Sequence, residues 1–120
     1  GVEIEAVRAY NVNKFRSPGV PFHPPEAEHV GFVVTVGGAR IYHTGDSDHI
    51  PEMAEIECDV ALLPVSGKYV MTVEEAAEAA RTLNPKIVVP MHYGSGIGTA
   101  GDGQRLTELY DGEVVILEPE

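Results

Sequence analysis

Alternating apolar and acidic residues over residues 2–7 have the period of two that predicts a half-buried strand. Residues 31–36 and 40–43 flank the pair Gly37-Gly38 and predict a β-hairpin, because glycine accepts the positive φ of a tight turn. Between these segments, residues 11–28 show no periodicity and contain four prolines. They predict a long loop, and loops of this length are usually functional or disordered.

Apolar runs alternate with helical segments in the rest of the chain. Residues 59–63 and 87–89 are nearly continuous apolar runs, typical of strands covered on both faces. Residues 72–75 form a capping box, which predicts a helix that ends near Leu83, where Asn84-Pro85 stops it. The remaining predicted elements are a short helical piece over 51–56, a helix over 102–110 and a closing strand over 113–117.

This alternation of strand and helix favours parallel strands. The carboxyl ends of strands at 39–43, 60–65 and 87–91 would then share one edge of the sheet, where open sheets bind ligands. Polar residues follow each of these strands in the sequence, namely Asp46, Asp48 and His49, then Ser66, Lys68 and Tyr69, then His92 and Tyr93. The sequence therefore predicts a functional site at this edge.

Composition narrows the class of protein. The 120 residues are 43% hydrophobic and 22% charged, which fits one globular domain. Eight Lys and Arg stand against nineteen Asp and Glu, and the net charge of −11 argues against nucleic acid or an anionic membrane as a partner. The single cysteine, Cys58, excludes an intrachain disulfide and favours a reducing cytoplasm. No apolar run approaches the ~20 residues of a membrane span.

Carboxylate and imidazole at one sheet edge predict a metal site, because they are ligands of zinc and its neighbours. Asp46 and His92 would supply two of the roughly three protein ligands of a catalytic site. His23 is the best candidate for the third, because its long loop can fold over the edge. The alternatives without a metal are ion pairs, histidines satisfied by other partners, and an Asx turn or helix cap at Asp46.

Three parts of the sequence resemble, in order and spacing, the second half of a metallo-β-lactamase-fold hydrolase: residues 42–48, then 62–67 with 71–76, then 89–94. They are most similar to the branch of metal-dependent hydrolases related to the ascorbate phosphate lactonase and the N-acyl-phosphatidylethanolamine phospholipase. The resemblance implies an α+β fold of the αββα four-layer sandwich family. Residues 1–120 would form its C-terminal half, an αβ unit with a mixed sheet, an N-terminal hairpin region and βαβ units.

The resemblance also implies the chemistry. Asp46 corresponds to a carboxylate that can bridge two metals, and His92 to the last histidine ligand. One or two divalent ions, zinc or manganese, would activate water for hydrolysis of an ester, a lactone or a phosphodiester-like substrate. Asp46 would orient or deprotonate that water while it ligates the metal.

Two departures from the family pattern change this expectation. The cluster His-x-His-x-Asp-His of the family's first half is absent from these 120 residues. The chain is therefore expected to pair with a first half or with itself, because half a sandwich exposes an apolar sheet face. The family also places a histidine ligand where this chain has Ala9-Tyr10-Asn11. Asn11 could coordinate through its carbonyl oxygen or hold a metal-bound water, and His23 could substitute from the same loop.

Several residues near the predicted metal ligands could contact a small-molecule substrate. Lys68 and Tyr69 could bind an anionic or carbonyl group, and the backbone amides of residues 94–96 could bind an oxyanion. Tyr93 and Gly94, directly after His92, complete the predicted substrate contacts.

Two other functions remain open at this point. The chain could be a non-catalytic half-domain that serves as a structural or assembly partner. Alternatively, Gly96, Gly98 and Gly101 form a G-x-G-x-x-G, which is a fingerprint of dinucleotide binding. Two features weaken the nucleotide hypothesis: the predicted strand does not run directly into Gly96, and too few residues follow Gly101 for the remaining βαβ units.

Overall fold

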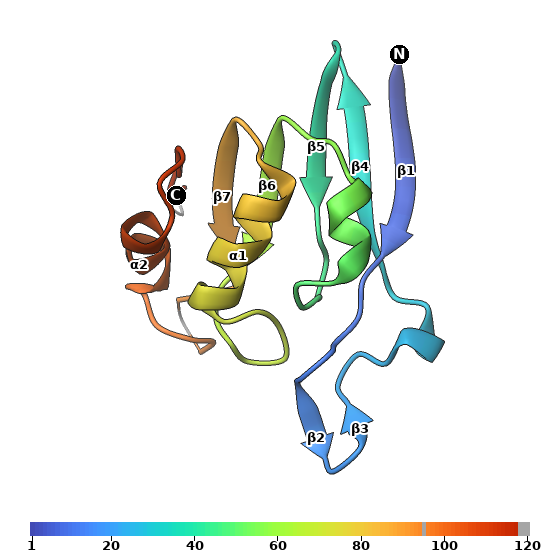
Figure 1. Cartoon of the computed structure of the whole chain (residues 1–120), viewed down its shortest axis with the longest axis vertical. Helices are drawn as coiled ribbons and strands as arrows, with labels where there is room; N and C mark the ends of the chain where they lie inside the picture. Colours follow the sequence, from blue (N-terminus) through green and yellow to red (C-terminus); the bar gives the residue numbers. More distant parts are fainter. Residues whose placement is uncertain (95, 118–120) are drawn as a thin grey trace.

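The computed structural model describes residues 1–94 and 96–117. It contains a five-stranded mixed sheet with the strand order β1-β4-β5-β6-β7 (Figure 1). Strands β1, β4 and β5 are antiparallel neighbours, and β5, β6 and β7 run parallel. The strand bounds are β1 Val2–Arg8, β4 Val30–Val36, β5 Ala39–His43, β6 Val60–Pro64 and β7 Ile87–Met91. The predicted α+β fold with a mixed sheet is confirmed.

Local sequence signals explain how these elements begin and end. Gly37 and Gly38 have φ values of 57° and 82°, which closes the β4–β5 hairpin as predicted. Helix α1 (Val73–Leu83) begins with the predicted capping box, in which Thr72 and Glu75 exchange side-chain and backbone hydrogen bonds. It ends at Asn84, whose left-handed φ of 48° turns the chain away. The other helices are η1 (Pro25–Ala27), η2 (Pro51–Glu55) and α2 (Asp102–Leu109).

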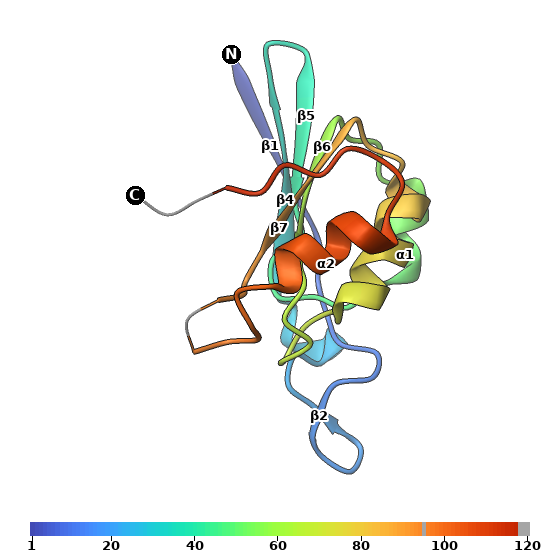
Figure 2. The same ribbon diagram turned by 90° about the vertical axis from the view of Figure 1, so that its left-hand side faces the viewer.

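One face of the sheet is covered by helices. Figure 2 shows η2, α1 and α2 to the same side of the strands. Helix α1 contacts η2, β6 and α2, and α2 also contacts β7. Four buried alanines of α1 let it lie close to the sheet, where it encloses the core with large buried side chains such as Tyr42, Leu63 and Leu106.

The opposite face of the sheet carries apolar side chains that no helix of the described residues covers. Strand register places Val2 beside Val36 and Ile4 beside Val34 on this face, with Phe32 further along β4. Val2 is 59% exposed, Ile4 67% and Phe32 42%. On β1 the glutamates point to the side of the helices, and the apolar side chains point to the opposite side. We call the surface formed by Val2, Ile4, Phe32, Val34 and Val36 the open face.

Two parts of the fold differ from the prediction. The loop over residues 11–28 contains a small two-stranded sheet, β2 (Phe15–Ser17) and β3 (Val20–Pro21), which projects from the body (Figure 1). The predicted closing strand over 113–117 is reduced to one parallel bridge between Val88 and Val114. None of the described helices is long and apolar enough to cross a membrane.

Candidate metal centre

Asp46 lies in a tight turn directly after β5. Gly45, with a φ of 68°, makes the turn, and the backbone of β4 passes beside it at Gly31. A Cβ atom on Gly31 would lie 2.5 Å from the Thr44 carbonyl oxygen, so this approach requires glycine. The close packing fixes the backbone of the turn, while the Asp46 side chain is 51% exposed at the sheet edge.

His23 reaches the same place from the long loop. Its Nε2 lies 3.6 Å from Oδ2 of Asp46. Its Nδ1 lies 3.2 Å from the carbonyl oxygen of Tyr69. A carbonyl oxygen only accepts, so Nδ1 carries the proton, and Nε2 is the atom with a lone pair when the ring is neutral.

Asn11 holds His23 in this position. Its Oδ1 accepts the backbone N–H of His23 at 2.7 Å, and its Nδ2 donates to the Tyr69 carbonyl oxygen at 2.8 Å. The side chain is buried and both of its polar atoms are engaged. In this structure Asn11 has the geometry of a positioning residue for His23, and its predicted contact with a metal, a metal-bound water or a substrate stays a prediction.

His92 completes the group from the end of β7. Its Nε2 lies 3.6 Å from Oδ1 of Asp46, and its Nδ1 lies 3.2 Å from Oγ of Ser66. Ser66 donates its hydroxyl hydrogen to the Lys68 carbonyl oxygen and can therefore accept from His92 Nδ1. His92 adopts a left-handed φ of 60°, a conformation that only a few per cent of residues other than glycine adopt. Such backbone strain is often found at functional sites.

The two histidines thus face different oxygens of one carboxylate. Donor atoms 3.6 Å apart can both lie about 2.1 Å from a shared ion. The two pairs do not converge on one point, and within residues 1–94 and 96–117 no group of three His, Cys, Asp or Glu side chains is placed to hold a metal by itself. Each pair therefore fits part of a metal site, with Asp46 shared, and each needs ligands from elsewhere.

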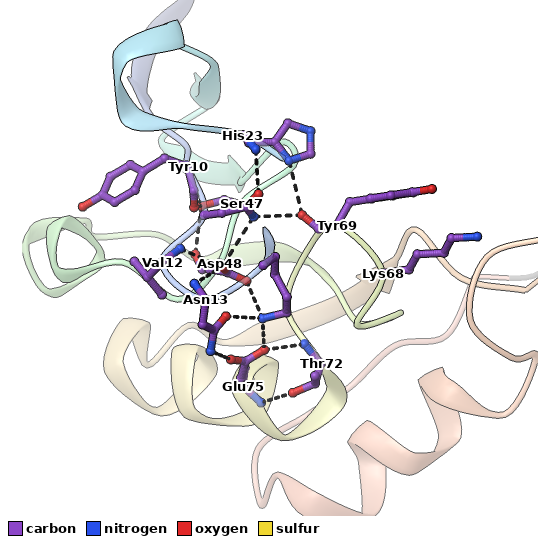
Figure 3. Close-up of polar contacts among 12 residues, drawn as sticks. Tyr10, Val12, Asn13, His23, Ser47, Asp48, Lys68, Tyr69, Thr72 and Glu75 are labelled. Atoms are coloured by element: carbon purple, nitrogen blue, oxygen red, sulfur yellow. Dashed lines mark hydrogen bonds and ion pairs between the residues drawn. The ribbon is translucent and has the colours of Figure 1, made fainter. Parts of the chain in front are cut away.

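A buried polar network that the sequence did not reveal supports the loop that carries His23 (Figure 3). Asp48 is fully buried, and its Oδ2 accepts the backbone N–H of Val12 at 2.8 Å. Lys14 lies 2.8 Å from Asp48 and 2.7 Å from Glu75 at the start of α1. The network joins the loop, the turn after Asp46 and the helix, so it fixes one end of the His23 segment to the body of the fold.

The predicted substrate-contacting residues lie around this centre. The Tyr69 carbonyl oxygen contacts Nδ1 of His23, and the Lys68 ammonium lies over the Tyr69 ring. Tyr93 packs against Gly103 of α2 and also lines, with Gly94, a hollow of about 660 Å³ beside His92. The predicted oxyanion loop over residues 94–96 includes Ser95, which lies outside the described residues.

The contacts of the other three histidines are with groups other than Asp46. His49 Nε2 lies 3.1 Å from Thr82 Oγ1 of α1. His43 accepts the Gly45 backbone N–H. His29 packs its ring edge-to-face on His23, with the ring centroids 5.2 Å apart. His29 is thus placed to steady the His23 ring.

The glycine loop departs from the usual dinucleotide-binding arrangement in two respects within the described residues. Strand β7 ends at Met91 and does not run into Gly96. The Asp102 carboxylate accepts hydrogen bonds from Thr99 at the start of α2, where a pyrophosphate would have to lie. Gly98 is close to Ser66 and Asp102, so its lack of a side chain serves packing beside the centre.

A mixed sheet covered by helices on one face, with polar residues at one edge, is the arrangement expected of half a metallo-β-lactamase-fold domain. Comparison with known families supports the same class: the model of the beta-lactamase superfamily domain matches residues 1–92. The chain therefore belongs to the beta-lactamase superfamily, as its sequence resemblance indicated.

Similar proteins carry related names. The chain is 36% identical over 109 residues to a UPF0173 metal-dependent hydrolase from Symbiobacterium thermophilum, covering 82% of this chain and 49% of that protein. It is 41% identical over 96 residues to another from Pyrococcus furiosus, covering 74% and 43%. The chain thus spans about half the length of the curated relatives it matches.

Solved structures show the same fold. A candidate metal-dependent hydrolase from Parabacteroides distasonis superposes with a TM-score of 0.83 and 38% identity, covering 99% of this chain and 52% of that one. A candidate zinc-dependent hydrolase of the metallo-β-lactamase superfamily from Thermotoga maritima gives 0.75 and 27%, covering 100% and 66%. The chain corresponds to part of each larger domain, which fits a half-domain.

Proposed function

We propose that this chain is the C-terminal half of a metal-dependent hydrolase, with Asp46, His23 and His92 as its metal ligands. The observation that carries the proposal is the placement of both histidine Nε2 atoms 3.6 Å from the two oxygens of one carboxylate. Family membership and the names of the relatives support a hydrolase that uses a divalent metal. Zinc is the metal we expect, with manganese as the alternative and with one or two ions bound.

The residues of this chain prepare the site for such an ion. Hydrogen bonds from Nδ1 fix the ring orientation of both histidines, which leaves each Nε2 available as a ligand. A divalent ion bound there would lower the pKa of water and polarise the scissile bond. Asp46, half exposed at the edge, can orient a water molecule and accept its proton at a carboxylate oxygen. Lys68 and Tyr69 lie where they can contact the substrate.

We further propose that a first half with additional histidine ligands covers the open face. The chain has two incomplete metal pairs and an exposed apolar sheet face, and both features would be completed by one partner. Exposed apolar patches of this kind are typical of association surfaces. Association with a second copy would cover the face but would add no His-x-His-x-Asp-His segment. We call the chain together with the polypeptide that supplies the first half the completed protein.

The test is metal content and hydrolysis in the completed protein. We expect one or two divalent ions per chain by mass spectrometry, and hydrolysis of p-nitrophenyl acetate or bis(p-nitrophenyl) phosphate. Asp46→Asn and His92→Ala should each lower metal content and turnover about tenfold or more. His49→Ala is the matched control, because His49 contacts α1 and not Asp46. If the two site variants behave like this control, the chain is an assembly partner and the enzyme proposal is wrong.

A further inference from the structure

Most of the cationic side chains of this acidic chain have an ion-pair or hydrogen-bond partner. All eight Lys and Arg lie in the described residues. Five of them form ion pairs with carboxylates, namely Arg8, Lys14, Arg81, Lys86 and Arg105. Arg40 donates to the Glu57 carbonyl oxygen. For Arg16 and Lys68, no carboxylate of the described residues pairs with the cationic group.

These two cations lie on a single pair of aromatic rings. The Arg16 guanidinium is 5.8 Å from the centre of the Phe22 ring, and the Lys68 ammonium is 5.5 Å from the centre of the Tyr69 ring. The two rings contact each other edge-to-face, with centroids 4.7 Å apart. Arg16, Phe22, Tyr69 and Lys68 thus form a continuous row, which we call the cation–ring row.

The cation–ring row adjoins the candidate metal centre. Phe22 immediately precedes His23, and the Tyr69 carbonyl oxygen holds Nδ1 of His23. Asn11 donates to the same carbonyl oxygen, so the backbone beneath the row is fixed. Figure 3 shows the Tyr69 and Lys68 side chains extending to one side, away from the buried network around Asp48. The row is thus joined to the candidate metal centre through His23, which lies 3.6 Å from Asp46.

The charge pattern indicates what the row binds. Between Glu5 and Glu26 the sequence contains no acidic residue, although the chain carries a net charge of −11. An anion that approaches such a chain needs a local region of positive charge. Arg16 and Lys68 supply this region, and the two rings between them, inclined at 76° to each other, supply an apolar surface.

We infer that the cation–ring row recognises the anionic group of the substrate, a phosphate or a carboxylate carried on a flat apolar group. The inference rests on the proposed hydrolase function and adds to it the substrate class and two residues, Arg16 and Phe22. Arg16 and Lys68 lie at opposite ends of the row, so either cation can donate charge-assisted hydrogen bonds to the anion, while the rings contact the apolar group and the other cation adds to the local positive charge. The scissile bond would then lie toward Asp46.

Titration calorimetry of the completed protein tests this with phenyl phosphate, benzoate and neutral benzyl alcohol. Arg16→Gln and Lys68→Gln should each weaken binding of the preferred anion about threefold to tenfold, and the double variant should weaken it further. Lys86→Gln is the matched control, because Lys86 pairs with Asp59 beyond the site. Phenyl phosphate and benzoate distinguish the two anion types. Thermal unfolding midpoints show whether each variant is folded.

The outcomes separate the two proposals. If folded Arg16→Gln and Lys68→Gln proteins bind both anions like Lys86→Gln, the cation–ring row is not an anion site. Equal loss of benzyl alcohol binding would also overturn the inference, because removal of a charge should spare a neutral ligand. Absence of metal and of hydrolysis in the wild type, with the anion discrimination intact, would instead refute the hydrolase and leave the anion site standing.

Discussion

Glu75 gives the sharpest quantitative prediction, because it joins the start of α1 to the loop that carries His23. Burial alone would raise the pKa of the Glu75 carboxyl group, but hydrogen bonds from Lys14, the Thr72 backbone and Asn13 lower it from 4.5 to about 2. A pKa difference of this size corresponds to about 3 kcal/mol before solvent screening is considered. The side chain is 26% exposed, so solvent screening reduces this to about 2 kcal/mol.

The sign of the pH dependence follows from the lowered pKa. A carboxyl group with a lower pKa in the folded state stabilises that state above its unfolded pKa. The contribution of Glu75 is therefore complete at pH 7 and is lost as the pH falls from 4.5 toward 2. Glu75→Gln removes the charge but keeps a side chain that can serve in the capping box. The variant should thus be about 2 kcal/mol less stable at pH 7 and should approach the wild type near pH 2.

Urea unfolding followed by circular dichroism measures this difference in the completed protein. Glu78→Gln is the matched control on the same helix, because Glu78 forms an exposed ion pair with Arg81. Its effect should stay within about 0.5 kcal/mol at every pH. Equal losses for Glu75→Gln and Glu78→Gln at pH 7, or a Glu75→Gln deficit that persists at low pH, would refute the assigned network.

Three further predictions test the parts of the fold around the site. Ser66→Ala removes the partner of His92 Nδ1 and should weaken metal binding about tenfold in a chelator competition, whereas Ser17→Ala in the projecting hairpin should not. Gly31→Ala should lower the free energy of unfolding by about 1–3 kcal/mol, because its Cβ would press on the Thr44 carbonyl. Gly101→Ala, with only one neighbour at 3.9 Å, should change it by less than about 0.5 kcal/mol. Burial raises the pKa of the Cys58 thiol to about 11. Alkylation of this thiol at pH 8 should therefore be about a hundredfold slower in the folded protein than in urea, because the thiolate is the reactive form. Equal rates would show that the thiol is not buried in the folded protein.

Regular elements were predictable because their signals are local. The capping box at Thr72, the pair Gly37-Gly38 and the apolar run before Pro64 each specify an element within a few residues. The prediction of a closing strand over residues 113–117 was wrong for the opposite reason. Its residues have strand composition, but strand formation depends on a neighbour, and only Val114 pairs with β7.

The candidate site was predictable in part. Asp46 and His92 follow parallel strands, so topology alone brings them to one edge, and the structure places them 3.6 Å apart. His23 could be proposed from the length of its loop. The hydrogen bonds by which Asn11 holds His23 and Tyr69 were not predicted, because these residues lie 12 and 58 positions along the chain. Their partners are set by tertiary packing, and no local pattern encodes them.

The central claim is that Asp46 is shared between metal ions held by His23 and His92. The most direct measurement is anomalous diffraction at the zinc edge from crystals of the completed protein. We expect one or two ions within about 2.2 Å of an Asp46 carboxylate oxygen and of Nε2 of His92 or His23. A fully metal-loaded protein whose ions lie elsewhere, with Asp46 joined to the histidines only by ion pairs, would contradict it.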